Sequence, residues 1–215
     1  MRGGCSKDGL DGKWVAAIKS CLHTRYGVVP KHQGQFWKDL PEKFNAYKQA
    51  TITNGDRVRA AHYQGIVDEG DPDRRDATFV RVSGHRILQC PHHSFPIALQ
   101  YSLVRDIHEK KPNVPPVFKG TEYFGQLISI MVIDLAPGIV PSITRSETHV
   151  LAIIGIRDTE TETRLGIPYY TEPKEAKVRA VDMNTLMCLV GRVRDGRRWA
   201  IVDRSGDMAR AEFVD

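Results

Sequence analysis

The first 48 residues place apolar side chains at the spacing of an α-helix. Within residues 11–27, Asp11 can cap the start of a helix and Gly27 can end it. A second apolar stripe covers residues 35–50, where Pro41 divides it or starts a fresh helix. The pattern therefore predicts two helices over roughly residues 11–48, with apolar faces at Trp14, Ala17, Ile18, Cys21 and Leu22, and at Phe36, Trp37, Leu40, Phe44 and Tyr47.

Beyond residue 48 the apolar positions follow a period of two, which is typical of strands. Asn54-Gly55 lies between two short runs and predicts a hairpin with strands at about 49–53 and 56–61. Further strand-like runs, separated by Gly/Pro-rich or polar turns, occupy residues 77–82, 86–90, 97–104, 123–133, 149–157, 186–193, 198–203 and 209–214. We therefore expect an α+β, mainly β fold, an antiparallel small barrel or sandwich preceded by two short N-terminal helices.

Two of these runs carry more specific expectations. Asp195-Gly196 separates alternating segments, which predicts a hairpin of residues 189–194 and 197–203 with Arg192 and Arg194 on one face. The apolar run at 124–135 is continuous enough to be central and buried on both faces for part of its length, and Gly125 in it indicates a close backbone approach or a bulge.

Composition is that of a globular chain. The 215 residues are 41% hydrophobic and 27% charged, and the longest apolar runs, 127–133 and 149–156, have the length of strands. Residues 1–13 lack the apolar core of a signal peptide, so we predict an intracellular protein, nuclear or cytoplasmic, with no membrane partner. The four cysteines form no CxxC pair, which favours reduced thiols.

The positive charge is unevenly distributed. Residues 1–50 hold nine Lys/Arg and four Asp/Glu, whereas residues 51–215 hold 22 of each, so the net charge of +5 lies in the first quarter. We predict a basic helical arm at 1–48 and a β-rich barrel or sandwich module at 49–215. The predicted nucleic-acid-binding residues are Lys13, Lys19, Arg25 and Lys31 on the arm and Arg192, Arg194, Arg197, Arg198 and Trp199 on the hairpin. The alternative is a solvated helix face and a hairpin kept soluble by its charges, with Trp199 in the core.

One cluster has the residue types of a metal site. Cys90, His92 and His93 lie close together, but in an extended segment the adjacent histidines point to opposite faces. His85, five residues before Cys90, or a distant residue such as Cys188 or His149 would have to complete a zinc shell, so we favour a bend between strands over a metal site. Phosphate-binding glycine loops and hydrolase motifs do not occur. We predict no catalytic residue, no metal and no cofactor.

Several segments resemble a known family in pattern and order. They are GDRVRAA (55–61), RRDATFVRV (74–82), EYFGQLISIMVIDL (122–135), HVLAIIGIRD (149–158) and the run at 181–210. Together, over roughly residues 45–215, they resemble the β-rich carboxy-terminal region of fungal transposon-associated proteins, the KDZ and Plavaka-type transposase relatives. The order GDxVR and then FGQLISI also looks like the bromo-adjacent-homology barrel. The first resemblance implies an accessory module without strand-transfer activity, and the second implies chromatin contact.

These observations predict a non-enzymatic intracellular binding module that contacts DNA or a chromatin or transposase protein. Two alternatives stay open: a metal-dependent enzyme using Cys90, His92 and His93, and a transposon remnant without a selected function. The sequence does not predict an oligomeric state.

Overall fold

The computed structural model confirms an α+β, mainly β fold. It describes residues 2–28, 32–61, 79–82, 104–106, 118–120, 123–161, 166–173, 175 and 177–203. The helical elements are α1 (Gly12–Tyr26), α2 (Gln33–Asp39) and the 3-10 turns η1 (Lys7–Gly9) and η4 (Met183–Thr185). The strands are β1 (Arg2–Ser6), β2 (Lys43–Tyr47), β3 (Gln49–Thr51), β4 (Arg57–Arg59), β5 (Phe79–Val82), β6 (Val104–Asp106), β7 (Phe118–Gly120), β8 (Tyr123–Leu135), β9 (Glu147–Arg157), β10 (Glu160–Thr161), β11 (Pro168–Tyr170), β12 (Lys177–Asp182), β13 (Leu186–Asp195) and β14 (Arg198–Asp203).

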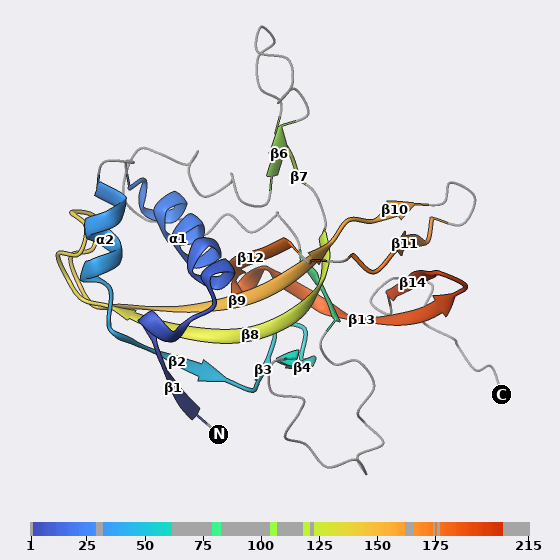
Figure 1. Cartoon of the computed structure of the whole chain (residues 1–215), viewed down its shortest axis with the longest axis horizontal. Helices are drawn as coiled ribbons and strands as arrows, with labels where there is room; N and C mark the ends of the chain where they lie inside the picture. Colours follow the sequence, from blue (N-terminus) through green and yellow to red (C-terminus); the bar gives the residue numbers. More distant parts are fainter. Residues whose placement is uncertain are drawn as a thin grey trace, which may run out of the picture.

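Ten of these strands form one antiparallel sheet that is organised around β8. The path runs β1-β2-β8-β5-β13-β14-β11-β10, and β9 joins β8 to β12. Figure 1 shows β8 and β9 as the long curved pair, with α1 and α2 above it and β10, β11 and β14 at the opposite end. The sheet is not closed into a barrel, which corrects that part of the prediction. The β3–β4 and β6–β7 pairs are separate from this sheet.

Helix α1 begins and ends at the predicted residues. The Asp11 carboxylate accepts a hydrogen bond from the Lys13 backbone N–H at 2.7 Å. Gly27 adopts the left-handed conformation at φ 60° and donates its N–H to the last turn. These two caps define the helix at both ends.

The second predicted helix is only partly helical. Helix α2 ends at Asp39, and residues 43–47, which we expected to be helical, form strand β2. Pro41 cannot donate a backbone hydrogen bond, and beyond it Phe44 and Ala46 alternate as buried residues with more exposed neighbours. Strand β2 pairs with both β1 and β8, so sheet hydrogen bonds replace those of a helix. Strand β1 was not predicted from the sequence.

One hydrophobic core lies between the two helices and the sheet. Ile18 and Leu22 of α1 and Phe36 of α2 pack with side chains from one face of β8 and β9, such as Ile133 and Ile153. The buried Lys7 amine donates to three carbonyl groups around the end of α2, those of Trp37, Lys38 and Leu40, at 3.0, 3.2 and 2.9 Å. Residues 1–48 therefore share a hydrophobic core with the β-rich part. The division into a helical arm at 1–48 and a module at 49–215 stays a prediction.

The opposite face of the same strands carries a second core. Leu127 and Ile130 of β8 pack with Ile154 and Ile156 of β9 and with Val80 of β5. The run at 124–135 is therefore buried on both faces, as predicted. Gly125 allows the expected close approach, because a Cβ there would lie 2.5 Å from Ile154 Cγ2 and 2.8 Å from the Gly155 carbonyl oxygen.

Both predicted hairpins form. At Asn54-Gly55 the strands are shorter than expected, and the connection spans residues 52–56, where the Asp56 N–H donates to the Asn54 side chain at 3.0 Å. Asp56 also accepts a hydrogen bond from the Leu189 N–H at 2.8 Å, which ties this hairpin to β13. The second hairpin joins β13 and β14 in the register Val190↔Asp203 to Asp195↔Arg198, with Gly196 at φ 59°.

Candidate nucleic-acid interface

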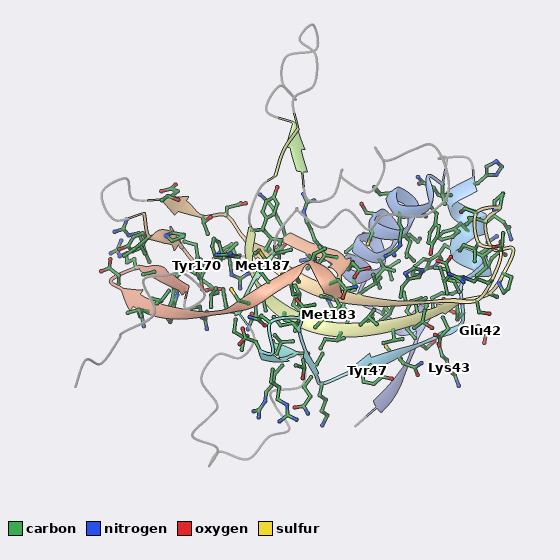
Figure 2. The ribbon with its side chains drawn as sticks, turned by 180° about the vertical axis from the view of Figure 1, so that it is seen from behind. Glu42, Lys43, Tyr47, Tyr170, Met183 and Met187 are labelled. Carbon is green, nitrogen blue, oxygen red and sulfur yellow. The ribbon has the colours of Figure 1, made fainter. Side chains whose placement is uncertain are left out.

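The two predicted groups of cations lie in different parts of the molecule. The predicted cations on α1 contact residues of α2, of β12 and of the segment before β12. The second group is carried by the β13–β14 hairpin at the far end of the sheet (Figure 1). Figure 2 marks the hairpin end by Tyr170 and Met187, well separated from Glu42 and Lys43. The two groups therefore do not form one continuous surface.

The described cations that we predicted as binding residues on the helical arm, Lys13, Lys19 and Arg25, each contact another side chain of the protein. Arg25 forms an ion pair with Asp182 at 2.8 Å, and the two side chains are only 17% and 16% exposed. Lys13 contacts Glu175 at 3.1 Å on the surface. The Lys19 amine lies 4.8 Å from the centre of the Trp37 ring. Lys31 lies outside the described residues.

Strand register divides the hairpin residues between its two faces. Arg194 lies opposite Trp199, and Arg192 lies opposite Ile201, so these side chains share one face. Arg198 lies opposite Asp195, and both point to the other face. Arg197 occupies the turn between the strands.

Arg192 is a structural residue at the base of this hairpin. Its guanidinium carbon lies 4.1 Å from the Phe79 ring centre and 4.7 Å from that of Trp199. It also donates a hydrogen bond to the Tyr170 hydroxyl at 3.0 Å, and its side chain is 16% exposed. Trp199 is partly buried against the same cluster. Arg192 is therefore poorly placed to reach a ligand.

A second arginine stabilises the same cluster. Arg157 is 6% exposed and forms an ion pair with Glu172 at 2.7 Å. Its guanidinium lies within 6 Å of the rings of Phe79 and Tyr170. Burial raises the pKa of Tyr170, although the hydrogen bond and charge of Arg192 act in the opposite direction. These contacts fix the base of the hairpin on the sheet.

The tip of the hairpin presents three exposed arginines. We define this tip as residues 194–198, with Arg194, Arg197 and Arg198 and the single acid Asp195. The Arg194 Nε donates to the Gly196 carbonyl at 3.4 Å. Arg198 stacks on Tyr169 at 4.5 Å and lies 3.6 Å from Asp195, with side chains 51% and 57% exposed. These charges face solvent and can contact an anion.

A polar cluster that the sequence did not predict lies under the end of α1. The Tyr26 hydroxyl donates to Glu147 at 3.0 Å and also contacts His149 Nε2. Burial lowers the pKa of His149, with a smaller contribution from the charge of Arg25. Tyr26 is 123 residues from His149 in sequence, so no local motif could have shown this pair. The cluster anchors α1 to β9.

The residues of the proposed metal site, Cys90, His92 and His93, lie outside the described residues, and so does His85. His149, named as a possible completing ligand, contacts Tyr26 and Glu147 instead, and Cys188 is buried in the hairpin cluster. Within the described ranges, no three His, Cys, Asp or Glu side chains are grouped to hold a metal ion.

Burial raises the pKa of Cys21 to about 11, so this thiol stays protonated at neutral pH.

Comparison with known proteins adds no relative. No protein-family model, curated protein or solved structure matches this chain. The resemblance to transposon-associated proteins therefore stays a prediction. Among the described residues, no helix is both long and apolar enough to cross a membrane.

Proposed function

We propose that this chain is an intracellular nucleic-acid-binding module, without catalytic activity of its own, that contacts DNA through the tip of the β13–β14 hairpin. The observation that carries the proposal is the exposure of Arg194, Arg197 and Arg198 around a single acid, Asp195. A guanidinium group forms paired, charge-assisted hydrogen bonds with phosphate oxygens, which suits this set to a nucleic-acid backbone.

The rigid base of the hairpin supports this proposal. Arg192 is held between Phe79 and Trp199, and β14 pairs with β11 at Trp199 and Ala200. The tip is therefore displayed from an ordered sheet, which lowers the entropy that binding must overcome. Three phosphate contacts would give a slope of about −3 in a plot of log affinity against log salt.

The experiment measures binding of the full chain to a short labelled DNA by fluorescence anisotropy at several salt concentrations. A tip variant, Arg194→Gln, Arg197→Gln and Arg198→Gln, is compared with a control, Lys38→Gln, Lys43→Gln and Arg57→Gln. Both variants remove three positive charges from exposed positions.

We expect the tip variant to weaken binding at low salt by about 100-fold or more and to bring the salt slope close to zero. The control should stay within a few-fold of the unmodified chain, because it changes only the long-range field. Equal weakening by both variants would contradict a local contact surface. Absence of binding by the unmodified chain at low salt would reject the proposed function.

A further inference from the structure

The hairpin tip carries cations on both of its faces. Arg194 lies on the face of Trp199, and Arg198 lies on the opposite face with Asp195, because side chains alternate along each strand. Arg197 lies in the turn between β13 and β14 and is exposed. A flat contact with the phosphate backbone of one nucleic-acid strand would use only one of these faces. Cations on two faces suit a site that has phosphates on both sides.

From Asp195 to Arg198 the tip is a narrow, two-stranded ribbon, and β11 lies beside β14 from Trp199 onward. Strand β5 pairs with β13 no further than Leu189, and β11 pairs with β14 only at Trp199 and Ala200. Within the described part of the chain, residues 191–195 therefore have only β14 beside them. The major groove of duplex DNA is about 12 Å wide and admits a two-stranded ribbon. Its depth of about 8.5 Å corresponds to two or three residues of each strand.

The sides of the hairpin are less suitable for a flat contact. On the face of Arg198, a hollow of about 260 Å³ next to Tyr169 is lined by Asp158, Glu160 and Glu175 as well as by Lys177. Asp158 pairs with Lys177 at 2.7 Å. Glu175 pairs with Lys13 at 3.1 Å, so most of the charge along this face is already compensated and a phosphate chain gains little there. On the other face, Trp199 and Arg192 pack against the body of the protein. Within the described part of the hairpin, only the tip combines exposure on both faces with positive charge.

We propose that the DNA partner is double-stranded and that residues 194–198 insert into its major groove, with Arg194 and Arg198 contacting opposite strands. Arg197 then points toward the floor of the groove, where an arginine can bind the edge of guanine. This inference rests on the proposed function and names its substrate class. It distinguishes the tip from a platform for single strands, which needs an exposed aromatic face free of acids.

The first test compares duplex and single-stranded DNA of one sequence. The unmodified chain should bind the duplex about tenfold or more tightly at the same salt. Arg194→Gln and Arg198→Gln should each reduce the salt slope on the duplex by about 1, and the double variant by about 2. Arg57→Gln, at an exposed position on β4, is the matched control and should leave the slope unchanged.

The second test identifies the groove. A duplex whose major groove is filled by glucosylated hydroxymethylcytosine should bind about tenfold more weakly, whereas saturation of the minor groove with netropsin should change affinity by no more than about twofold. Asp195→Asn removes the acid beside Arg198 and should strengthen duplex binding, which a misfolded variant could not do.

The outcomes separate the two proposals. If the triple tip variant binds like the unmodified chain, the proposed function fails. If that variant loses binding but single strands bind as well as duplex, only the groove inference is overturned. The same holds if netropsin competes, or if only one of Arg194 and Arg198 affects the slope.

Discussion

The helix-covered half of the molecule and its hairpin end use basic residues in opposite ways. Arg25 on α1 is largely buried against Asp182, and Lys19 lies over Trp37. At the hairpin tip, Arg194 and Arg197 are exposed, and Arg198 is half-exposed beside Asp195. Part of the excess positive charge of the first quarter of the chain therefore forms contacts inside the protein. Residues 51–215 have equal numbers of acids and bases, yet they present a local group of cations at the hairpin tip.

This difference shows that the number of basic residues in a segment does not measure its capacity to bind an anion. A paired and desolvated arginine stabilises the fold, and its charge is compensated before a ligand arrives. An exposed arginine next to few acids keeps its charge for a partner. The core around β8 and β9 and the hairpin also differ in how closely their atoms are packed, and substitutions can measure this difference.

The largest expected effect is at Gly125 in the two-sided core. Gly125→Ala places a Cβ 2.5 Å from Ile154 Cγ2 and 2.8 Å from the Gly155 carbonyl oxygen, so β8 and β9 must separate. We expect a loss of about 3 kcal/mol in the free energy of unfolding, measured by urea denaturation. In the hairpin, the Cβ added by Gly191→Ala would lie 3.6 Å from its nearest atom, so the free energy of unfolding should fall by less than about 0.5 kcal/mol. Equal losses in the free energy of unfolding would contradict tighter packing around Gly125 than around Gly191.

The Arg25–Asp182 ion pair should come next. Arg25→Met leaves a mostly buried carboxylate without its partner, and we expect a loss of about 2 kcal/mol, below that of a fully buried pair because both groups keep some solvent contact. The matched control is Lys13→Met, which breaks a pair whose side chains are 56% and 77% exposed and should cost at most about 0.5 kcal/mol. Thermal and urea unfolding of both variants measure the difference. Similar losses would contradict the structural role of Arg25.

Within the hairpin, Arg192 and Arg194 share a strand face but differ in their surroundings. Arg192→Lys removes a planar guanidinium from between Phe79 and Trp199 and should cost about 1.5 kcal/mol. Arg194→Lys changes an exposed side chain and should leave the free energy of unfolding within about 0.3 kcal/mol. If the second substitution destabilised the protein as much as the first, the tip would be part of the core.

The smallest predicted effect, counted per pH unit, is a pH dependence of stability that arises in the helix-covered half. His149, 4% exposed, has a pKa lowered by burial and by Arg25, against the opposing effects of Glu147 and Asp182. The unfolded chain therefore binds a proton that the folded chain does not, and stability falls as the pH drops below 6.5, the ordinary pKa of histidine. The loss is at most about 1.4 kcal/mol per pH unit, and it is absent above that pH.

Urea denaturation between about pH 7.5 and about pH 5 measures this dependence. His149→Gln should flatten the curve relative to the unmodified chain, although it also loses the Tyr26 contact and is less stable at every pH. His23, whose pKa is also lowered by burial, contributes a slope in the same direction that remains in this variant. An unchanged slope in His149→Gln would contradict a neutral, buried His149.

Local signals predicted much of the fold. The Asp11 and Gly27 caps, the two glycine turns and the double-sided burial of the run at 124–135 were readable because each depends on neighbouring residues. Residues 43–47 were misassigned because their apolar positions fit both a helix and a strand, and pairing with β1 and β8 decided between them. Glycine and small polar residues gave β1 no clear period.

The candidate site was predictable only as a set of residues. Strand alternation correctly placed Arg192 and Arg194 on one face, but it could not show that Phe79 and Trp199 enclose Arg192. Asp182, which engages Arg25, is 157 residues away in the chain. Such partners are set by the tertiary fold, so sequence proximity cannot distinguish a compensated cation from an available one.

The most direct test of this account compares the salt dependence of duplex binding in two variants that each lose two positive charges. One is Arg194→Gln with Arg197→Gln at the tip, and the other is Lys13→Gln with Lys19→Gln on α1. Point substitutions are used because deletion of residues 1–48 would remove Ile18 and Leu22 from the core. We expect the tip pair to reduce the slope by about 2 and the α1 pair to leave it nearly unchanged. A reduced slope for the α1 pair and an unchanged one for the tip pair would contradict it.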